Sequence, residues 1–188
     1  MGVDHAVLSF FNRPGFAPLD AVMVVLSANW FGLLLAGLAA LAIAKWGRFR
    51  WRASLALIAA VAVADAGSAR LIKPAVARVR PCNERPPQSN AFAGCGRGQS
   101  FPSSHATNVA AAALVAGWAL PPAWPIAAAL AFLIGLSRLY LGVHWPSDVL
   151  CGWLLGLLIG GLAIALLRRF GAPAPHGGLL AGSRKPEA

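Results

Sequence analysis

Long apolar runs alternate along the chain with short polar segments, and this pattern predicts a bundle of membrane-spanning helices. A helix needs about 20 apolar residues to cross the core of a bilayer. Five runs come near this length, at residues 18–45, 53–72, 104–120, 124–140 and 148–168. Asp20 and Asn29 weaken the start of the first run, so this span can break near the sequence SANWFG. The stretch Val3–Phe11 is too short to cross and predicts a short interfacial helix.

Composition supports the same fold class, an all-α integral membrane bundle. Of the 188 residues, 58% are hydrophobic and 12% are charged, whereas a soluble domain carries about 25% charged residues. This length allows one membrane-embedded domain over residues 1–170 and leaves no room for a second. Residues 171–188 are rich in Gly, Pro and Ala, and we expect a disordered tail there.

The net charge of +10 raises the alternative of nucleic-acid binding. The basic residues, however, border apolar segments instead of lining a soluble face, so we do not expect nucleic acid as a partner. Anionic head groups of the lipid bilayer and phosphate-bearing substrates fit this distribution better.

Clusters of basic residues predict the orientation in the membrane. The segment KWGRFRWR, residues 45–52, carries four positive charges, and the C-terminal region carries four more, Arg168, Arg169, Arg184 and Lys185. With five spans both regions lie on one side, which the positive-inside rule places in the cytoplasm together with the tail. The opposite face carries as many basic residues, and a binding site facing the periplasm would explain them. They are Arg13, Arg70, Lys73, Arg78, Arg80, Arg85, Arg97 and Arg138.

Three polar segments meet at this outer face in the predicted topology: KPAVARVRP at 73–81, PSSH at 102–105 and SRLYLGVHWPSD at 137–148. Lys73 and Arg80 are seven residues apart, so two helical turns would place both on one side. Arg138 falls at the end of the fourth span. Three cations close together repel one another, but they suit a phosphate dianion, which accepts charge-assisted hydrogen bonds.

The segment PSSH has the pattern of a helix start, with Ser103 as the N-cap. The first turn of a helix has unpaired N–H groups and the positive end of the helix dipole, so it can bind an anion. His105 falls in that turn and can donate a proton to a leaving oxygen. Taken alone, the segment also fits an ordinary cap with His105 facing water.

His144 and Asp148 are four residues apart, and Pro146 and Ser147 between them predict the start of the fifth span. A carboxylate one turn on can hold an imidazole N–H and stabilise the imidazolium. The other ring nitrogen is then free to attack phosphorus. We therefore expect His144 to be the nucleophile and His105 the acid, although this pair alone also fits a helix cap at the membrane surface.

Together these segments resemble the type 2 phosphatidic acid phosphatase superfamily. The first reads Lys73, six residues and Arg80-Pro81, and the third reads Ser137-Arg138, five residues, His144, three residues and Asp148. The second departs from the family's Pro-Ser-Gly-His, because Ser104 stands in place of the Gly. Ser keeps the backbone N–H but adds a side chain near the phosphate, which bears on the fine geometry and leaves the reaction class unchanged, provided that the backbone there does not need a positive φ.

The resemblance implies a metal-independent lipid phosphatase without a cofactor, acting through a phosphohistidine. Phosphate would be held by Lys73, Arg80, Arg138, Ser103 and the Ser104 N–H. His144 would attack with Asp148 behind it, and His105 would protonate the leaving group and then activate water. No cluster of carboxylates or of Cys and His in the sequence suggests a catalytic metal.

These features predict a multi-pass enzyme of a bacterial inner membrane with its active site facing the periplasm. Undecaprenyl pyrophosphate is the first expected substrate, and phosphatidylglycerophosphate, phosphatidic acid and a lipid A phosphate remain alternatives. A non-catalytic lipid-phosphate binder or transporter is the competing class, but it would not need both histidines and Asp148. The sequence assigns no oligomeric state.

Three smaller features complete the expectations. Cys82 and Cys95 flank a loop on the outer face, where a disulfide can form. Asp65 lies within the second span, and because intramembrane acids are costly when unpaired, we expect an ion pair with Arg70 beside the site. Glycines recur every fourth residue in the fifth span and allow close packing within the bundle, at Gly152, Gly156 and Gly160.

Overall fold

The computed structural model describes residues 2–13, 15, 17–85, 87, 89–91, 94–96 and 98–170. Within these ranges the chain is helical and contains no β-strand, so the predicted all-α fold is confirmed. The expected tail at 171–188 lies outside the described residues. The α-helices are α1 (Val3–Phe11), α2 (Ala17–Leu26), α3 (Asn29–Trp46), α4 (Arg50–Ala66), α5 (Lys73–Val76), α6 (Ser104–Ala119), α7 (Trp124–Tyr140) and α8 (Pro146–Phe170).

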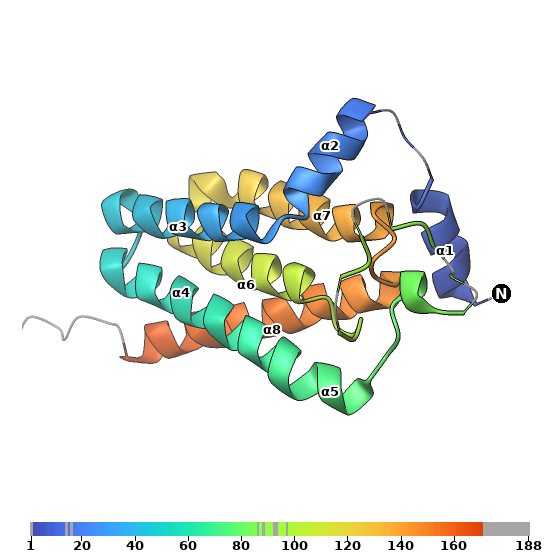
Figure 1. Ribbon diagram of the computed structural model, residues 1–188. Helices are drawn as coiled ribbons and strands as arrows, with labels where there is room; N and C mark the ends of the chain where they lie inside the picture. The colour runs from blue at the N-terminus through green and yellow to red at the C-terminus, as the bar shows by residue number, and fades with distance from the viewer. Residues whose placement is uncertain are drawn as a thin grey trace, which may run out of the picture.

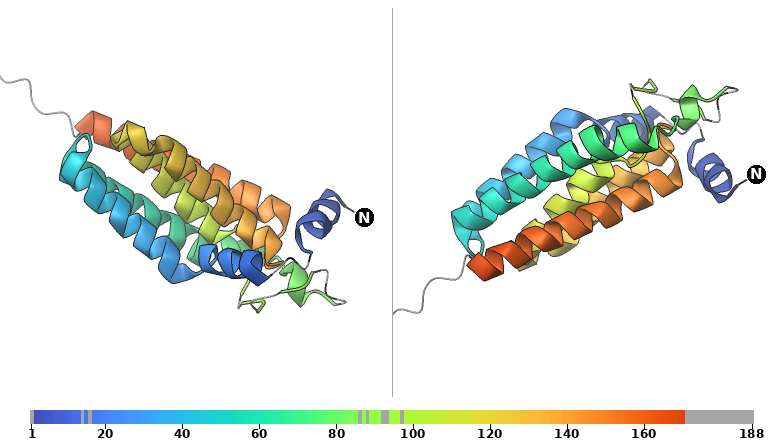
Figure 2. Two further views of the ribbon diagram at one scale, coloured as in Figure 1. Left: turned by 90° about the horizontal axis from the view of Figure 1, so that it is seen from above. Right: turned by 90° about the horizontal axis from the view of Figure 1, so that it is seen from below.

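Helix α6 lies at the centre of the bundle and packs against α3, α4, α7 and α8 (Figures 1 and 2). Its inward positions carry small side chains such as Ala106, Ala110 and Ala111, which let the neighbouring helices approach closely. Four helical segments among the described residues are long and apolar enough to cross a membrane: Asn29–Trp46, Arg50–Val76, Pro121–Tyr140 and Pro146–Phe170. Helix α6, which has 16 residues, lies among them.

The first predicted span is interrupted where the sequence allowed a break. Helix α2 ends at Leu26 and α3 begins at Asn29, and the two residues between them turn the chain (Figure 1). The short N-terminal helix α1 is also present, and it lies at the end of the bundle where α5 and the start of α8 are found. We call this the site end. The α3–α4 connection and the end of α8 lie at the opposite end.

Helix α4 continues through a π-helical segment, η1 (Gly67–Ile72), into α5 and stops at Val76. Ala77 has a left-handed backbone with φ of 51°, and residues 78–80 after it are not helical. The expectation that Lys73 and Arg80 share one helix face is therefore wrong. Pro81, which opens the short 3₁₀ turn η2 (Pro81–Asn83), disfavours a helical Arg80 and keeps this segment extended.

The glycines of α8 face α6. A Cβ added at Gly152 would lie 2.8 Å from the Ser103 carbonyl oxygen, and one added at Gly160 would lie 3.0 Å from the Ala111 carbonyl oxygen. The close approach of the two backbones lets the Ser103 N–H donate to the Asp148 carbonyl, at 3.0 Å. The start of α8 is thereby fixed beside the start of α6, which brings the second and third polar segments together.

Candidate active site

The predicted phosphate-binding and catalytic residues meet in one pocket at the site end. We call it the cation pocket; its volume is about 490 Å³, and it is lined by Lys73, Arg80, Ser104, His105, Arg138 and His144. Ser103 and Asp148 are fully buried behind this lining. Among the described residues, no group of three or more His, Cys, Asp or Glu side chains could hold a metal ion.

Backbone carbonyls hold the three cations of the pocket in place. Lys73 Nζ donates to the Pro102 carbonyl at 2.7 Å, and Arg80 Nη1 donates to the Val143 carbonyl at 2.9 Å. Arg138 donates to the Ser27 carbonyl at 3.1 Å and contacts the Ser27 hydroxyl, while its Nε is buried without a partner. Burial lowers the pKa of Arg80, with the nearby Asp148 acting in the opposite direction. These contacts fix the positions of the three cations. An anion bound between them can accept hydrogen bonds from their other N–H groups.

Ser103 caps α6, accepting at its hydroxyl a 3.5 Å hydrogen bond from the Ala106 N–H. Ser104 is the first residue of the helix and does not have the positive φ that would require glycine. Its hydroxyl lies 3.0 Å from that of Ser68 in η1. The serine at the family's glycine position therefore fits the backbone without strain and keeps its N–H at the helix start.

His144 lies in the short loop before α8, with its side chain only 2% exposed. Its Nε2 is 3.2 Å from Arg80 Nη1 and belongs to the pocket lining, whereas its Nδ1 is 3.4 Å from Asp148 Oδ2. The Nδ1–Oδ2 approach is within ion-pair distance but is not aligned as a hydrogen bond. Burial, and then Arg138, Arg80 and Lys73, hold the pKa of His144 well below its ordinary value. A neutral ring with Nε2 facing an anion is the form that can act as a nucleophile.

His105 lines both the cation pocket and a second, larger space. We call this space the apolar cavity; its volume is about 640 Å³, and it runs between α3, α4, α6 and α7. Its walls are mostly aliphatic, including Leu33, Ile58 and Ala112, and Ser104 and His105 line both spaces. His105 Nε2 is buried without a hydrogen-bond partner. It is therefore available to a ligand atom located between the two spaces.

The expected ion pair between Asp65 and Arg70 is not formed. Asp65 lines the apolar cavity and accepts a hydrogen bond from Asn108 Nδ2 at 3.0 Å instead. Arg70 lies in the π-helical segment η1, and its side chain is exposed. Cys82 and Cys95 form a disulfide with Cα atoms 5.8 Å apart.

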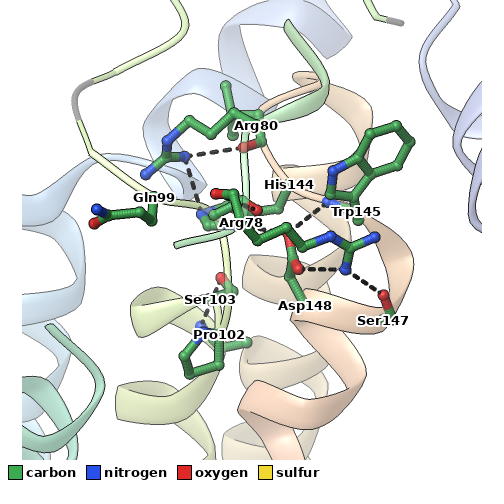
Figure 3. A network of polar contacts seen from close by, with 12 residues as sticks. Arg78, Arg80, Gln99, Pro102, Ser103, His144, Trp145, Ser147 and Asp148 are labelled. Atoms are coloured by element: carbon green, nitrogen blue, oxygen red, sulfur yellow. Dashed lines mark hydrogen bonds and ion pairs between the residues drawn. The ribbon is translucent and has the colours of Figure 1, made fainter. Parts of the chain in front are cut away.

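Two residues absent from the expected site lie next to its buried carboxylate in a chain of contacts: Arg78 contacts Asp148, and Asp4 contacts Arg78. Arg78 Nη1 donates to Asp148 Oδ1 at 2.8 Å, and Arg78 Nη2 donates to Asp4 Oδ2 at 2.6 Å. Figure 3 shows Arg78 reaching Asp148 and Ser147 beside the ring of Trp145. Because residues i and i+2 of an extended segment share a face, reading residues 78–80 as extended would have grouped Arg78 with Arg80. No local pattern marks Asp4, which is 74 positions from Arg78.

The structure is thus a helical bundle with candidate membrane spans that gathers three cations and two histidines in one pocket at one end. The chain belongs to the PAP2 superfamily, whose family model matches residues 49–172. The resemblance inferred from the three polar segments is confirmed.

Several relatives with printed activities are similar to parts of the chain. Lipid A 4'-phosphatase of Bacteroides thetaiotaomicron is 33% identical over 153 residues, covering 74% of this chain and 68% of the relative. Decaprenylphosphoryl-5-phosphoribose phosphatase of Mycolicibacterium smegmatis is 38% identical over 126 residues, covering 67% and 63%. Undecaprenyl-diphosphatase of Sulfolobus acidocaldarius is 41% identical over 68 residues, covering 36% and 33%. The chain thus spans only about a third of the length of several curated relatives.

A solved structure has the same fold over most of both chains. It is the crystal structure of a transmembrane PAP2 type phosphatidylglycerolphosphate phosphatase from Bacillus subtilis. The TM-score is 0.72 at 26% identity, and the match covers 89% of this chain and 85% of that chain. The helical membrane architecture is therefore common to the two proteins.

Proposed function

We propose that the protein is a membrane lipid phosphatase that hydrolyses a phosphomonoester or diphosphate of a lipid through a phosphohistidine. The observation that carries this proposal is the position of His105 between a cationic pocket and an apolar cavity. A lipid phosphate has the same division, with an anionic head and an apolar chain. When each part occupies its matching space, the bond between them lies beside His105.

Binding comes first. Lys73, Arg80 and Arg138 surround the phosphate, and the N–H groups at the start of α6 supply further donors. The pentacoordinate transition state carries more charge on its equatorial oxygens than the bound ester does. Cations that are already fixed in position stabilise that state more than the ground state.

The reaction then takes two steps. Nε2 of neutral His144 forms a bond to phosphorus while the phosphorus–oxygen bond to the lipid breaks, and His105 gives its proton to the departing oxygen. His144 becomes a cation that Asp148 stabilises. In the second step His105 takes a proton from water, the water oxygen bonds to phosphorus, and the bond to Nε2 breaks to release inorganic phosphate.

Undecaprenyl diphosphate is the substrate we place first, followed by phosphatidylglycerophosphate, phosphatidic acid and a lipid A phosphate. A cavity lined mostly by Leu, Ile, Val and Ala suits a flexible hydrocarbon chain. The names of the relatives from Sulfolobus and Mycolicibacterium support a polyprenyl lipid, and that of the Bacteroides relative supports lipid A.

We further propose that the site end faces the outside of a bacterial inner membrane. The disulfide between Cys82 and Cys95 lies in the loop that leads from α5 to α6, and disulfides persist in oxidising compartments. The basic segment at 45–52 lies at the opposite end, as the positive-inside rule requires of a cytoplasmic loop.

A panel of lipid phosphates in detergent tests this function. The purified chain is expected to release inorganic phosphate from at least one of the four lipids, and His144→Ala is expected to lower kcat by about 10⁴-fold or more. Cys151→Ala, at the lone free cysteine of the described residues, serves as the matched control. A lipid-phosphate binder or transporter would bind these lipids and release no phosphate, and that outcome would contradict the proposal.

A further inference from the structure

Asp148 is fully buried and has few partners that can balance its charge. Its Oδ2 accepts a hydrogen bond from the Trp145 N–H at 2.9 Å and faces His144 Nδ1. Its Oδ1 accepts from Arg78 Nη1 at 2.8 Å. Within the described part of the chain, Arg78 is the Arg or Lys side chain that forms an ion pair with Asp148. Because burial without a cation favours the protonated form of a carboxylate, the ion pair with Arg78 favours the ionised form of Asp148.

Arg78 is itself held from several sides. It donates to the Ser147 hydroxyl at 2.7 Å, and its guanidinium lies 5.2 Å from the centre of the Trp145 ring. Its Nη2 donates to Asp4 Oδ2 at 2.6 Å. The planar guanidinium thus bridges two carboxylates with separate N–H groups, a geometry that the single ammonium of Lys does not reproduce.

Asp4 comes from α1 and also binds the first turn of α8. Its Oδ1 accepts from the Ser147 N–H at 2.9 Å, and its Oδ2 contacts the Ser147 hydroxyl at 2.6 Å. Burial raises the pKa of Asp4, but hydrogen bonds from Ser147 and Arg78 outweigh it and leave the pKa lowered. Asp4 is therefore a carboxylate cap on a helix that begins 142 residues later in the chain. Helix α1 lies outside the matched range 49–172.

The charges along this chain of contacts can be counted separately from those of the three cations in the pocket. Arg78 and Asp148 alone form a neutral pair, which would do little to stabilise a cationic His144 ring. Asp4 adds a second negative charge, so that two carboxylates and one guanidinium sum to −1. That remaining charge is available when His144 bonds to phosphorus and its ring becomes positive.

We propose that Asp4 and Arg78 are positioning residues, which through Asp148 orient His144 and stabilise its cationic, phosphorus-bonded form. The inference rests on the proposed function for the reaction that His144 performs. It adds a role for α1, which carries none of the three polar segments and yet supplies one end of the network.

Binding of two oxyanions separates this role from a purely structural one. Orthovanadate bonds to a nucleophile as a mimic of the pentacoordinate transition state, whereas inorganic phosphate occupies only the anion site. Asp4→Asn is expected to weaken vanadate binding about tenfold and phosphate binding less than about twofold, measured by calorimetry on the full chain in detergent. The charged groups facing His144 are unchanged in this variant: Arg80, Arg138, Lys73, His105 and Asp148.

Kinetics on the same variants provide the second measurement. Arg78→Met is expected to lower kcat about 100-fold with little change in KM, and Arg78→Lys to recover part of the loss because it restores the charge. Adding Asp4→Asn to Arg78→Met should lower kcat little further, because Arg78→Met has already broken the network. Asp20→Asn, the same chemical change at a carboxylate that contacts Tyr140, is the control and should leave both measurements unchanged.

The outcomes distinguish this inference from the proposed function. If wild-type protein hydrolyses none of the lipids but Asp4→Asn still weakens vanadate selectively, the function fails and the network stands. If vanadate and phosphate affinities fall together in Asp4→Asn, or if the variant matches Asp20→Asn in both measurements, the positioning role is overturned.

Discussion

The cation pocket and the apolar cavity lie on either side of His105, yet they bind their ligands by different physical means. The cation pocket uses a few directional contacts, and each of its cations is fixed by backbone carbonyls. The apolar cavity is lined mostly by aliphatic side chains, which exclude water without fixing an orientation. A change in the first region should therefore affect every phosphate substrate, whereas a change in the second should affect only substrates with a lipid chain.

The largest difference is expected from removing a cation. Arg138→Ala should lower kcat/KM about 10²- to 10³-fold for a lipid phosphate and equally for water-soluble p-nitrophenyl phosphate, because both place charge in the same pocket. Arg85→Ala removes the same charge from an exposed position at the site end and serves as the control. If Arg138→Ala lowered activity towards the lipid phosphate alone, the assignment of different roles to the two regions would be wrong.

Filling the apolar cavity should have a smaller and more selective effect. Ala112 lines the cavity from α6, and Ala112→Phe is expected to raise KM for the lipid about tenfold while leaving p-nitrophenyl phosphate hydrolysis unchanged. Ala165→Phe introduces the same bulk at an exposed position of α8 and is the matched control. Equal losses with both substrates would mean that the cavity does not hold the lipid chain.

The pH dependence provides a further test of the cation pocket. The nucleophile must be neutral, and the lowered pKa of His144 moves the loss of its neutral form to more acidic pH. The acid limb of kcat/KM is therefore expected well below pH ~6.5, the ordinary histidine value, once ionisation of the substrate phosphate is taken into account. An acid limb near or above that value, measured with a substrate whose phosphate ionises at lower pH, would show that the cations do not act on this ring.

The smallest effect is expected at Ser104. Ser104→Gly restores the family's residue at the start of α6 while keeping the backbone N–H that we propose for phosphate binding. We expect kcat to change no more than about threefold, because the backbone there needs no glycine. Ser104→Pro, which removes that N–H, is the informative comparison in the same assay. A large gain on Ser104→Gly would mean that the serine side chain obstructs the anion.

The parts of the site that follow from sequence are those set by local geometry. Ser103 caps α6 and Asp148 lies one turn beyond His144, because both arrangements depend on residues three or four positions apart. The sequence predicts a helix from Lys73 to Arg80, whereas the helix ends at Val76. Nothing in the residues before Ala77 indicates that the backbone of Ala77 becomes left-handed. The link between Asp4 and Arg78 depends on how α1 packs against the bundle, which a local pattern does not encode.

The expected pair of Asp65 and Arg70 illustrates the same limit. The cost of an intramembrane acid correctly predicted that Asp65 would have a partner, but the partner is Asn108, 43 positions away on another helix. The cost of an unpaired acid thus indicates that Asp65 has a partner, and the packing of α4 against α6 determines which residue that partner is.

Trapping the phosphorylated protein tests the central claim most directly. Full-length chain is mixed with a ³²P-labelled lipid phosphate, quenched in alkali, in which phosphohistidine survives, and digested for mass spectrometry. The mechanism predicts phosphate on the ring of His144 in the wild-type protein and none in His144→Ala. Phosphate on a different residue, or rapid hydrolysis in His144→Ala, would contradict it.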